Sequence, residues 1–217
     1  MNPLAIHDRD DVRSDQRGNP NGERERRFVK PFWEGHRVRL RAIEPDDARY
    51  HFEVDRERDV DRNLDAVMPP NSMARAGKWA REASERGFRD GDCFLFEIEA
   101  LDSGEIVGSI DTHHCDARAG VFEYGISVRE QQRGKGYASE AIMLVLRYYF
   151  LERRYQKCNV GVFDFNEASV RLHEGLGFAL EGRRRRQTYT GGAYHDMLLF
   201  GMTIEEFQER HPDYLEM

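Results

Sequence analysis

Apolar and polar residues alternate along several short stretches of the chain, which is the pattern of strands that bury one face. The first stretch is HRVRLRA, at residues 36–42. Asp102-Ser103-Gly104 and Gly191-Gly192 each separate two such stretches and predict tight turns, so the strands on either side form hairpins. We expect seven strands, at residues 36–42, 93–100, 105–113, 121–128, 156–163, 178–190 and 193–202.

Helical spacing of apolar residues predicts four helices between these strands. Pro45 begins the first, because proline fits the first helical turn, and Ser72 is the expected N-cap of the second, which ends at Gly87. The third covers residues 136–154 and the fourth residues 166–176, closed by Gly177. Strands that come first in hairpins and later alternate with helices predict a mixed-sheet α/β or α+β layer fold.

The chain has 217 residues with a formal net charge of −7, a length that suits one domain. Residues 1–35 hold equal numbers of acidic and basic residues and few large apolar ones before Phe28. Such a segment buries too little surface to offset its ordering entropy, so we expect a largely disordered extension over 1–35 and one domain over 36–217. Phe28, Phe32 and Trp33 are the residues of the extension that could dock on the domain.

Composition excludes several classes of protein. No apolar run is long enough to span a membrane, and the acidic N-terminus has no apolar segment of the secretory kind. Three cysteines without a CxxC motif fit a reducing cytoplasm. The acidic balance argues against a nucleic-acid binder. Arg183–Arg186 could contact RNA, but successive strand residues alternate between faces, which favours a solvated edge.

The segment that carries chemistry runs from Val121 to Ala138. A buried strand leads into a loop with Gly134 and Gly136, and the loop leads directly into a helix. Glycines let the backbone approach a ligand closely, and the first turn of a helix offers unpaired N–H groups to a phosphate. The sequence is neither GxxxxGK[ST] nor GxGxxG, and by itself such a step is more often a tight turn than a phosphate site.

Its context resembles the GNAT superfamily of N-acetyltransferases. Gln131-x-x-Gly134-x-Gly136 is similar to the acetyl-coenzyme A loop of that superfamily, and residues 166–178 resemble its next motif. Residues 38–46 resemble its opening strand and turn. Gly191-Gly-Ala-Tyr-His-Asp196 resembles the hairpin of the branch with ribosomal-protein and spermidine N-acetyltransferases. The resemblance covers residues 36–207.

The resemblance implies a GNAT fold, with a mixed, mostly antiparallel sheet that splays at the coenzyme site and is flanked by helices. Acetyl-coenzyme A is then the cosubstrate, with its pyrophosphate on backbone N–H groups of the loop and its pantetheine against the strand before it. Asn166 could bind the pantetheine or cap its own helix, but not both comfortably. The implied coenzyme residues are Ile126, Val128, Arg133, Gly134, Lys135, Gly136, Tyr137, Ala138, Asn166 and Ser169.

For catalysis the resemblance implies direct transfer of acetyl to a primary amine. Glu123 is the expected general base, acting through water, and the alternative is an outward-facing strand carboxylate. Many relatives carry tyrosine, the proton donor to the thiolate, where this chain has His173. We expect Ser169 or His173 to take that role.

The acceptor is expected to be a small polyamine-like amine or a protein N-terminus. Residues 44–65 hold nine acidic residues against four arginines, and in the family this stretch forms one side of the acceptor cleft. It could attract a cation or simply be a solvated helix face. The alternatives to an enzyme are a non-catalytic acetyl-coenzyme A sensor and a ribosome- or RNA-associated factor. A homodimer is left open.

His113-His114-Cys115-Asp116 has the composition of a metal-ligand cluster. Adjacent residues of a strand point to opposite faces, however, so neighbouring side chains cannot converge on one ion. We therefore expect a polar strand end there and no metal.

Overall fold

The computed structural model describes residues 31–56, 67, 69–86 and 92–215. Its centre is a seven-stranded sheet with the order β1-β2-β3-β4-β5-β7-β6, in which every neighbouring pair is antiparallel except β4 and β5. The mixed, mostly antiparallel sheet predicted above is confirmed. The strands are β1 (Val38–Arg41), β2 (Leu95–Ala100), β3 (Ile106–Asp116), β4 (Val121–Val128), β5 (Lys157–Phe163), β6 (Ala179–Thr190) and β7 (Ala193–Thr203).

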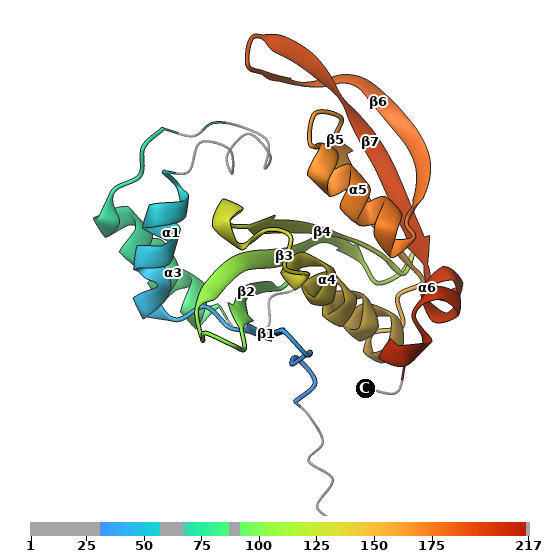
Figure 1. Cartoon of the computed structure of the whole chain (residues 1–217), viewed down its shortest axis with the longest axis horizontal. Coiled ribbons are helices and arrows are strands. Elements are labelled where there is room, and N and C mark those ends of the chain that lie inside the picture. The colour runs from blue at the N-terminus through green and yellow to red at the C-terminus, as the bar shows by residue number, and fades with distance from the viewer. Residues whose placement is uncertain (1–30, 57–66, 68, 87–91, 216–217) are drawn as a thin grey trace, which may run out of the picture.

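Helices cover both faces of the sheet. Side chains along β2 alternate between the two faces of the sheet. Glu97 contacts His51 of the first helix on one face, and its neighbour Ile98 packs into the core on the opposite face. The helices are α1 (Ala48–Val54), preceded by the 3-10 turn Pro45–Asp47, α3 (Met73–Glu85), α4 (Tyr137–Arg147), α5 (Glu167–Leu176) and α6 (Ile204–Arg210). Short turns lie at Glu130–Gln132 and Pro212–Tyr214. In Figure 1, α1 and α3 stand side by side, and the β6–β7 hairpin projects beyond the rest of the molecule.

The main core lies between the sheet and α4. Every residue of α4 from Glu140 to Arg147 is buried, as expected of a helix that is apolar on most sides. Phe122 of β4 stacks on Tyr149 at 4.0 Å between ring centroids, and both rings are fully buried. Tyr149 belongs to the π-helical turn that continues α4, so this packing fixes the position of β4 relative to α4 and to the loop that joins them.

The predicted elements are found with small shifts at their ends. The hydroxyl of Ser72 accepts from the N–H of Arg75 at 3.2 Å, so the predicted N-cap is confirmed. That helix ends at Glu85, and the expected terminator Gly87 lies outside the described residues. The third helix is α-helical only to Arg147 and continues as a π-helical turn over Tyr148–Glu152. Helix α6 was not predicted.

The part of the N-terminal extension that the structure describes packs on the sheet. Trp33 lies 4.8 Å from both Phe96 and Tyr148 between ring centroids, and its carbonyl accepts from the N–H of Leu40 at 2.8 Å. The docking of Trp33 is therefore as expected, whereas residues 1–30 lie outside the described residues. Within the described residues, no helix has the length and apolar character that a bilayer crossing demands.

Glu140, in the first turn of α4, ties that helix to β1. Its carboxylate accepts from the backbone N–H groups of His36, Arg37 and Val38 at 2.7, 2.7 and 2.8 Å. Hydrogen bonds to an ionised acceptor are short and strong. The segment before the strand runs so close that a Cβ on Gly35 would lie 2.4 Å from the carboxylate carbon of Glu140.

Candidate active site

The strands β4 and β5 form a fork. They pair only over Val121–Glu123 with Lys157–Asn159, and the last pair is Glu123 with Asn159. Beyond it β4 continues to Val128, while β5 remains paired with β7 up to Phe163. The splay predicted for the coenzyme site is therefore present, and Glu123 stands where the two strands part.

A cavity of about 420 Å³ lies at this fork. Three segments line it: the end of β4, the loop with the first turn of α4, and the first half of α5. Of the ten predicted coenzyme residues, all but Lys135 line the cavity. The lining residues are Ile126, Ser127, Val128, Gln132, Arg133, Gly134, Gly136, Tyr137, Ala138, Ser139, Asn166, Ala168, Ser169 and Leu172.

Lys135 is held outside the cavity lining. Its ammonium donates to Oε1 of Gln132 at 2.6 Å, and its backbone carbonyl accepts from the guanidinium of Arg37 at 2.8 Å. Ser127, Gln132, Ser139, Ala168 and Leu172 are lining residues that the sequence analysis did not name. The position of Ser139 in the first helical turn after Gly136 was the available signal.

The loop and the start of α4 form a cradle for an anion. Gly136 is the N-cap in left-handed conformation, with φ of 82°, and no side chain caps the helix. The first N–H groups of α4 therefore have no partner within the helix, and the helix dipole adds positive potential there. At Gly134, with φ of 77°, an added Cβ would meet nothing within 4 Å, so the backbone is open to a ligand. The residues present fit a phosphate group.

Asn166 is the N-cap of α5. Its Oδ1 accepts from the N–H of Ser169 at 3.1 Å. Because the side-chain carbonyl is used by the helix, only the amide group of Asn166 is left to donate to a ligand in the cavity. The structure thus places Asn166 both at the cap and on the cavity wall.

His173 lies behind the cavity wall with 1% of its surface exposed. Its Nδ1 is 2.7 Å from the carbonyl oxygen of Ser169 and 3.3 Å from Oγ of that residue. Its Nε2 is 2.8 Å from the hydroxyl of Tyr124. Burial lowers the pKa of His173 and raises that of Tyr124 well above its usual value, so both are neutral at pH 7. Of the three residues, only Ser169 lines the cavity.

Glu123 faces the other side of the sheet from Tyr124, where three polar side chains gather around it. Its Oε2 lies 3.2 Å from Nδ1 of His114 and 3.8 Å from Nε2 of His113. Nδ1 of His113 is 2.9 Å from Oδ2 of Asp111, and this hydrogen bond raises the pKa of the imidazole. Glu123 is not part of the cavity lining and is 37% exposed.

The expectation that His113 and His114 point to opposite faces is wrong. The pairing of β3 with β4 shifts between His113 and Asp116, and His114 has a left-handed backbone with φ of 48°. A bulge of this kind re-aims the side chain at the extra residue. Both imidazoles therefore reach Glu123.

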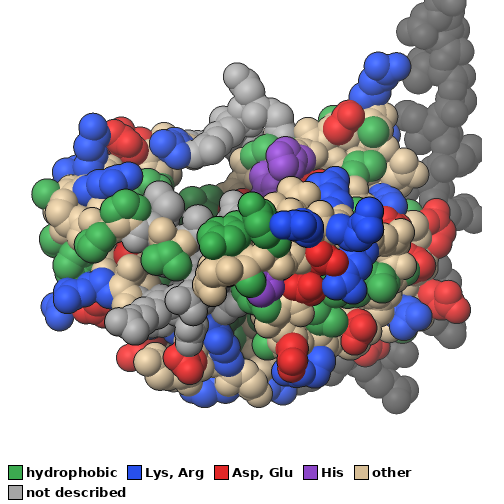
Figure 2. All heavy atoms as spheres, turned by 90° about the horizontal axis from the view of Figure 1, so that it is seen from above, with side chains coloured by type: hydrophobic (Ala, Val, Ile, Leu, Met, Phe, Trp, Pro, Cys, Tyr) green, Lys and Arg blue, Asp and Glu red, His purple; other side chains and the backbone are tan. Residues whose placement is uncertain are grey.

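The acidic stretch is partly neutralised by its own neighbours. Burial raises the pKa of Asp47, but the paired hydrogen bonds from Arg41, at 2.8 and 2.9 Å, outweigh it, and the net shift is downward. Glu53 accepts from Arg49, and Asp55 accepts from Asn71. On the face seen in Figure 2, acidic and basic side chains lie next to each other. The acids from 57 to 65 lie outside the described residues.

The arginine run of β6 is also engaged within the chain. Arg183 donates to Asp196 at 2.5 Å and to Asp164 at 3.1 Å. The guanidinium of Arg186 lies 4.3 Å from the ring centroid of Tyr194. These contacts occupy two of the four arginines that an RNA surface would need.

Comparison with known proteins places these features in a family. Residues 37–179 match the model described as the acetyltransferase (GNAT) domain. An uncharacterized N-acetyltransferase derived from the SPbeta prophage of Bacillus subtilis strain 168 is 43% identical over 180 residues, which are 83% of this chain and 97% of that protein. The spermidine N(1)-acetyltransferase of Escherichia coli K12 is 25% identical over 181 residues, covering 81% of this chain and 91% of that protein.

Solved structures show the same fold. The crystal structure of spermidine N-acetyltransferase from Vibrio cholerae, in complex with CoA and spermine, superposes with a TM-score of 0.67 at 20% identity. The match covers 78% of this chain and 97% of that one. The structure of the microcin C7 self-immunity acetyltransferase, in complex with acetyl-CoA and AMP, gives a TM-score of 0.69 at 14% identity. That match covers 78% of this chain and 94% of the other.

Proposed function

Because the chain belongs to the acetyltransferase (GNAT) family and is an N-acetyltransferase, we propose that it transfers acetyl from acetyl-coenzyme A directly to a primary amine. The observation that carries this proposal is the cavity at the β4–β5 fork, which ends at an uncapped helix N-terminus. An extended ligand with a phosphate at one end and a thioester at the other suits that shape.

The chain's own residues would bind the coenzyme mainly through backbone. N–H groups of the loop and of the first turn of α4 hold the pyrophosphate. Past the fork, β4 has no β5 residue opposite it, so its backbone from Ile126 to Val128 is available to the pantetheine arm. A backbone N–H there also donates to the thioester oxygen and stabilises its negative charge as the amine attacks.

The proton of the attacking amine goes to Glu123, through water. Glu123 is three residues from Ile126 along the strand, about 10 Å, so the proton would travel along a chain of water molecules and not by direct contact. Nearby, Oδ1 of Asn159 is buried without a hydrogen-bond partner among the described residues. That atom would suit an ordered water or the amine itself.

The departing thiolate takes its proton from Ser169. The hydroxyl of Ser169 lines the cavity, and Nδ1–H of His173 is 3.3 Å behind it. Solvent water then restores the proton on Ser169, because His173 is neutral and its Nδ1–H is held by a backbone carbonyl 2.7 Å away. No step of this transfer calls on a metal ion.

The acceptor class that fits best is a small polyamine. The Escherichia coli relative is named a spermidine N(1)-acetyltransferase, and acidic residues are dense in the segment from Glu44 to Asp65. A protein N-terminus is the second acceptor to test. Both present a primary amine that must lose its proton before it attacks the thioester.

The test is release of free coenzyme A thiol from acetyl-coenzyme A across a panel of amines. The panel contains spermidine, spermine, a neutral alkylamine, an aminoglycoside and peptides with basic N-termini, with fully acetylated spermidine as the matched control. We expect thiol release with spermidine and one added acetyl group by mass spectrometry. Binding of acetyl-coenzyme A without release for any amine would contradict the proposal and favour a sensor.

A further inference from the structure

Two histidines and a glutamate converge on the sheet face opposite Tyr124. One ligand atom from each of His113, His114 and Glu123 lies within 4.8 Å of the other two. Both imidazoles approach the same oxygen, Oε2 of Glu123, at 3.8 and 3.2 Å. Ligand atoms about 2.0–2.2 Å from a shared ion lie roughly 3–3.6 Å apart, so the 3.2 Å pair already fits and the 3.8 Å pair has to shorten by a few tenths of an ångström.

The fold holds these three groups together by two separate devices. Glu123 and His113 are directly paired across β3 and β4, so their side chains share a face. His114 joins them only because its backbone is left-handed, a conformation that costs energy in a residue other than glycine. Backbone strain of this kind concentrates at functional sites, so the bulge supports a functional role for the three side chains that it brings together.

A fourth residue orients the first imidazole. Asp111 accepts from Nδ1 of His113 at 2.9 Å, which leaves the lone pair on Nε2 directed at the cluster. Metal-binding histidines usually donate a hydrogen bond from the N–H of their second ring nitrogen to a carboxylate in this way. Gly125 makes room for this carboxylate, because a Cβ there would lie 2.8 Å from Oδ1 of Asp111.

We propose that His113, His114 and Glu123 bind a divalent transition-metal ion, with zinc as the representative. Two imidazoles and one carboxylate suit zinc, cobalt, nickel and copper, whereas magnesium and calcium prefer sets of oxygen ligands. The side chains are 40%, 75% and 37% exposed, so one side of the ion stays open to water. Water would complete the coordination, so no ligand from a second chain is required.

The bound ion would inhibit acetyl transfer. A carboxylate that coordinates a metal cannot accept a proton from the amine, so zinc and catalysis compete for Glu123. This consequence rests on the proposed function, whereas metal binding itself does not.

The test measures zinc binding to the tag-free chain by calorimetry and cobalt binding by visible absorption, neither of which needs activity. The decisive variant is His114→Asn, because asparagine tolerates the left-handed backbone but lacks the imidazole. The matched control is His195→Ala, whose imidazole lies 3.6 Å from Asp164, an imidazole–carboxylate pair outside the cluster.

We expect one zinc per chain, a loss of affinity of 100-fold or more in His114→Asn, and a loss of about 10-fold or more in Asp111→Asn. His195→Ala should bind zinc as the wild type does. Zinc should inhibit transfer by the wild type but not by His114→Asn. Absence of saturable zinc and cobalt binding, or equal binding by wild type and His114→Asn, would overturn the site. Zinc binding without any transfer activity would contradict the proposed function only.

Discussion

The hydroxyl of Tyr124 lies 2.8 Å from Nε2 of His173, and this contact fixes the tautomer of the imidazole. Nδ1 faces a backbone carbonyl, which only accepts, so Nδ1 carries the proton and Nε2 receives the hydrogen bond from tyrosine. A neutral histidine is thus fully paired within the core, one helical turn from the hydroxyl of Ser169 on the cavity wall.

Acid should destabilise the fold through His173. Burial lowers its pKa in the folded state, so below its unfolded value of about 6.5 the unfolded chain binds a proton that the folded chain does not. Stability is therefore full above that pH and is lost as pH falls below it, by up to about 1.4 kcal/mol for each pH unit until the folded pKa is reached.

Urea unfolding at pH 7.5 and 5.5 tests this effect. His173→Gln should be less stable than the wild type at pH 7.5, because glutamine does not fill the buried site of the imidazole. The difference in free energy of unfolding between the two proteins should be smaller at pH 5.5. Equal pH dependence in the two proteins would show that His173 does not contribute.

Ser169→Ala tests the proton donor. We expect kcat to fall by about 10²-fold while KM for acetyl-coenzyme A stays nearly constant, because the hydroxyl acts on the leaving thiolate. If Ser169 only holds the coenzyme, KM rises and kcat is unchanged. Steady-state kinetics with the best amine separate the two results.

Gly134→Val should abolish coenzyme binding. A branched side chain would cover the open backbone at the loop and strain a residue with φ of 77°. Gly104→Val is the matched control, since Gly104 has φ of 70° and the same free space around a Cβ, but lies in the β2–β3 turn. Calorimetric titration with acetyl-coenzyme A should show binding in the control alone. Affinity within about threefold of wild type in Gly134→Val would refute the loop assignment.

Glu123→Gln should lower kcat by about 10²-fold or more, the usual contribution of a general base. The loss should shrink as the assay pH approaches the pKa of the amine, because more acceptor is then already deprotonated. Glu105→Gln, on the β2–β3 turn, serves as the control and should be unaffected. A loss that does not vary with pH would assign the role to another group.

Salt should weaken the use of a cationic acceptor. If the acids between Glu44 and Asp65 attract it, kcat/KM for spermidine falls steeply with ionic strength, because screening removes the attraction. Replacing Asp55, Asp59 and Asp61 together with asparagine should remove that dependence, although only Asp55 lies within the described residues. A salt-independent kcat/KM, or a better neutral acceptor, would contradict the idea.

Local patterns predicted most of the fold and the glycine loop that lines the cavity. Strand alternation and the turn residues at 102–104 and 191–192 act over a few positions, so the sequence alone carries them. The same holds for Gly134 and Gly136, whose positive φ angles follow from their place between a strand and a helix. Helix α6 was also readable, because Thr203 and Glu206 form a capping box, but this signal was missed.

Features that depend on long-range packing could not be read in this way. The orientation of His114 depends on how β3 pairs with β4, since the bulge exists only in that pairing. The burial of His173 depends on Tyr124, which is 49 residues away along the chain. The pairing of Asp47 with Arg41 likewise turned an expected surface acid into a structural one.

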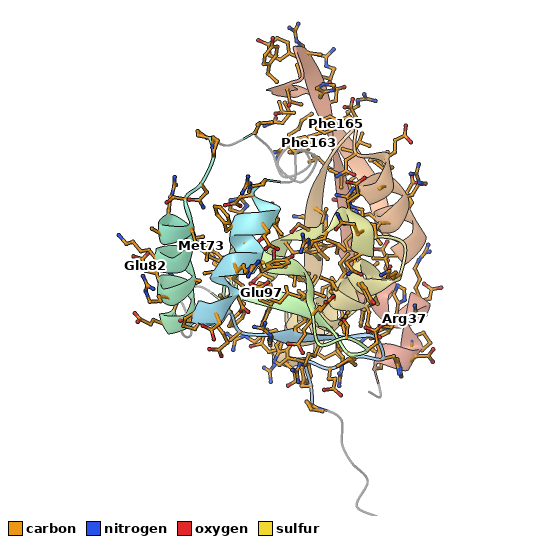
Figure 3. All side chains as sticks on the ribbon, turned by 60° about the vertical axis from the view of Figure 1, so that its left-hand side comes forward. Arg37, Met73, Glu82, Glu97, Phe163 and Phe165 are labelled. Atoms are coloured by element: carbon orange, nitrogen blue, oxygen red, sulfur yellow. The ribbon has the colours of Figure 1, made fainter. Side chains whose placement is uncertain are left out.

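The carboxylate of Glu140 links the first turn of α4 to the edge strand of the sheet. It belongs to the first turn of α4, which we propose holds the coenzyme. It accepts hydrogen bonds from the amides of residues 36–38 at the start of β1. Figure 3 shows Arg37 low on the molecule, away from the projecting hairpin. A ligand that binds only the folded turn stabilises everything that must open with it. Acetyl-coenzyme A should therefore slow hydrogen–deuterium exchange at these amides, although the edge strand itself is not part of the cavity wall.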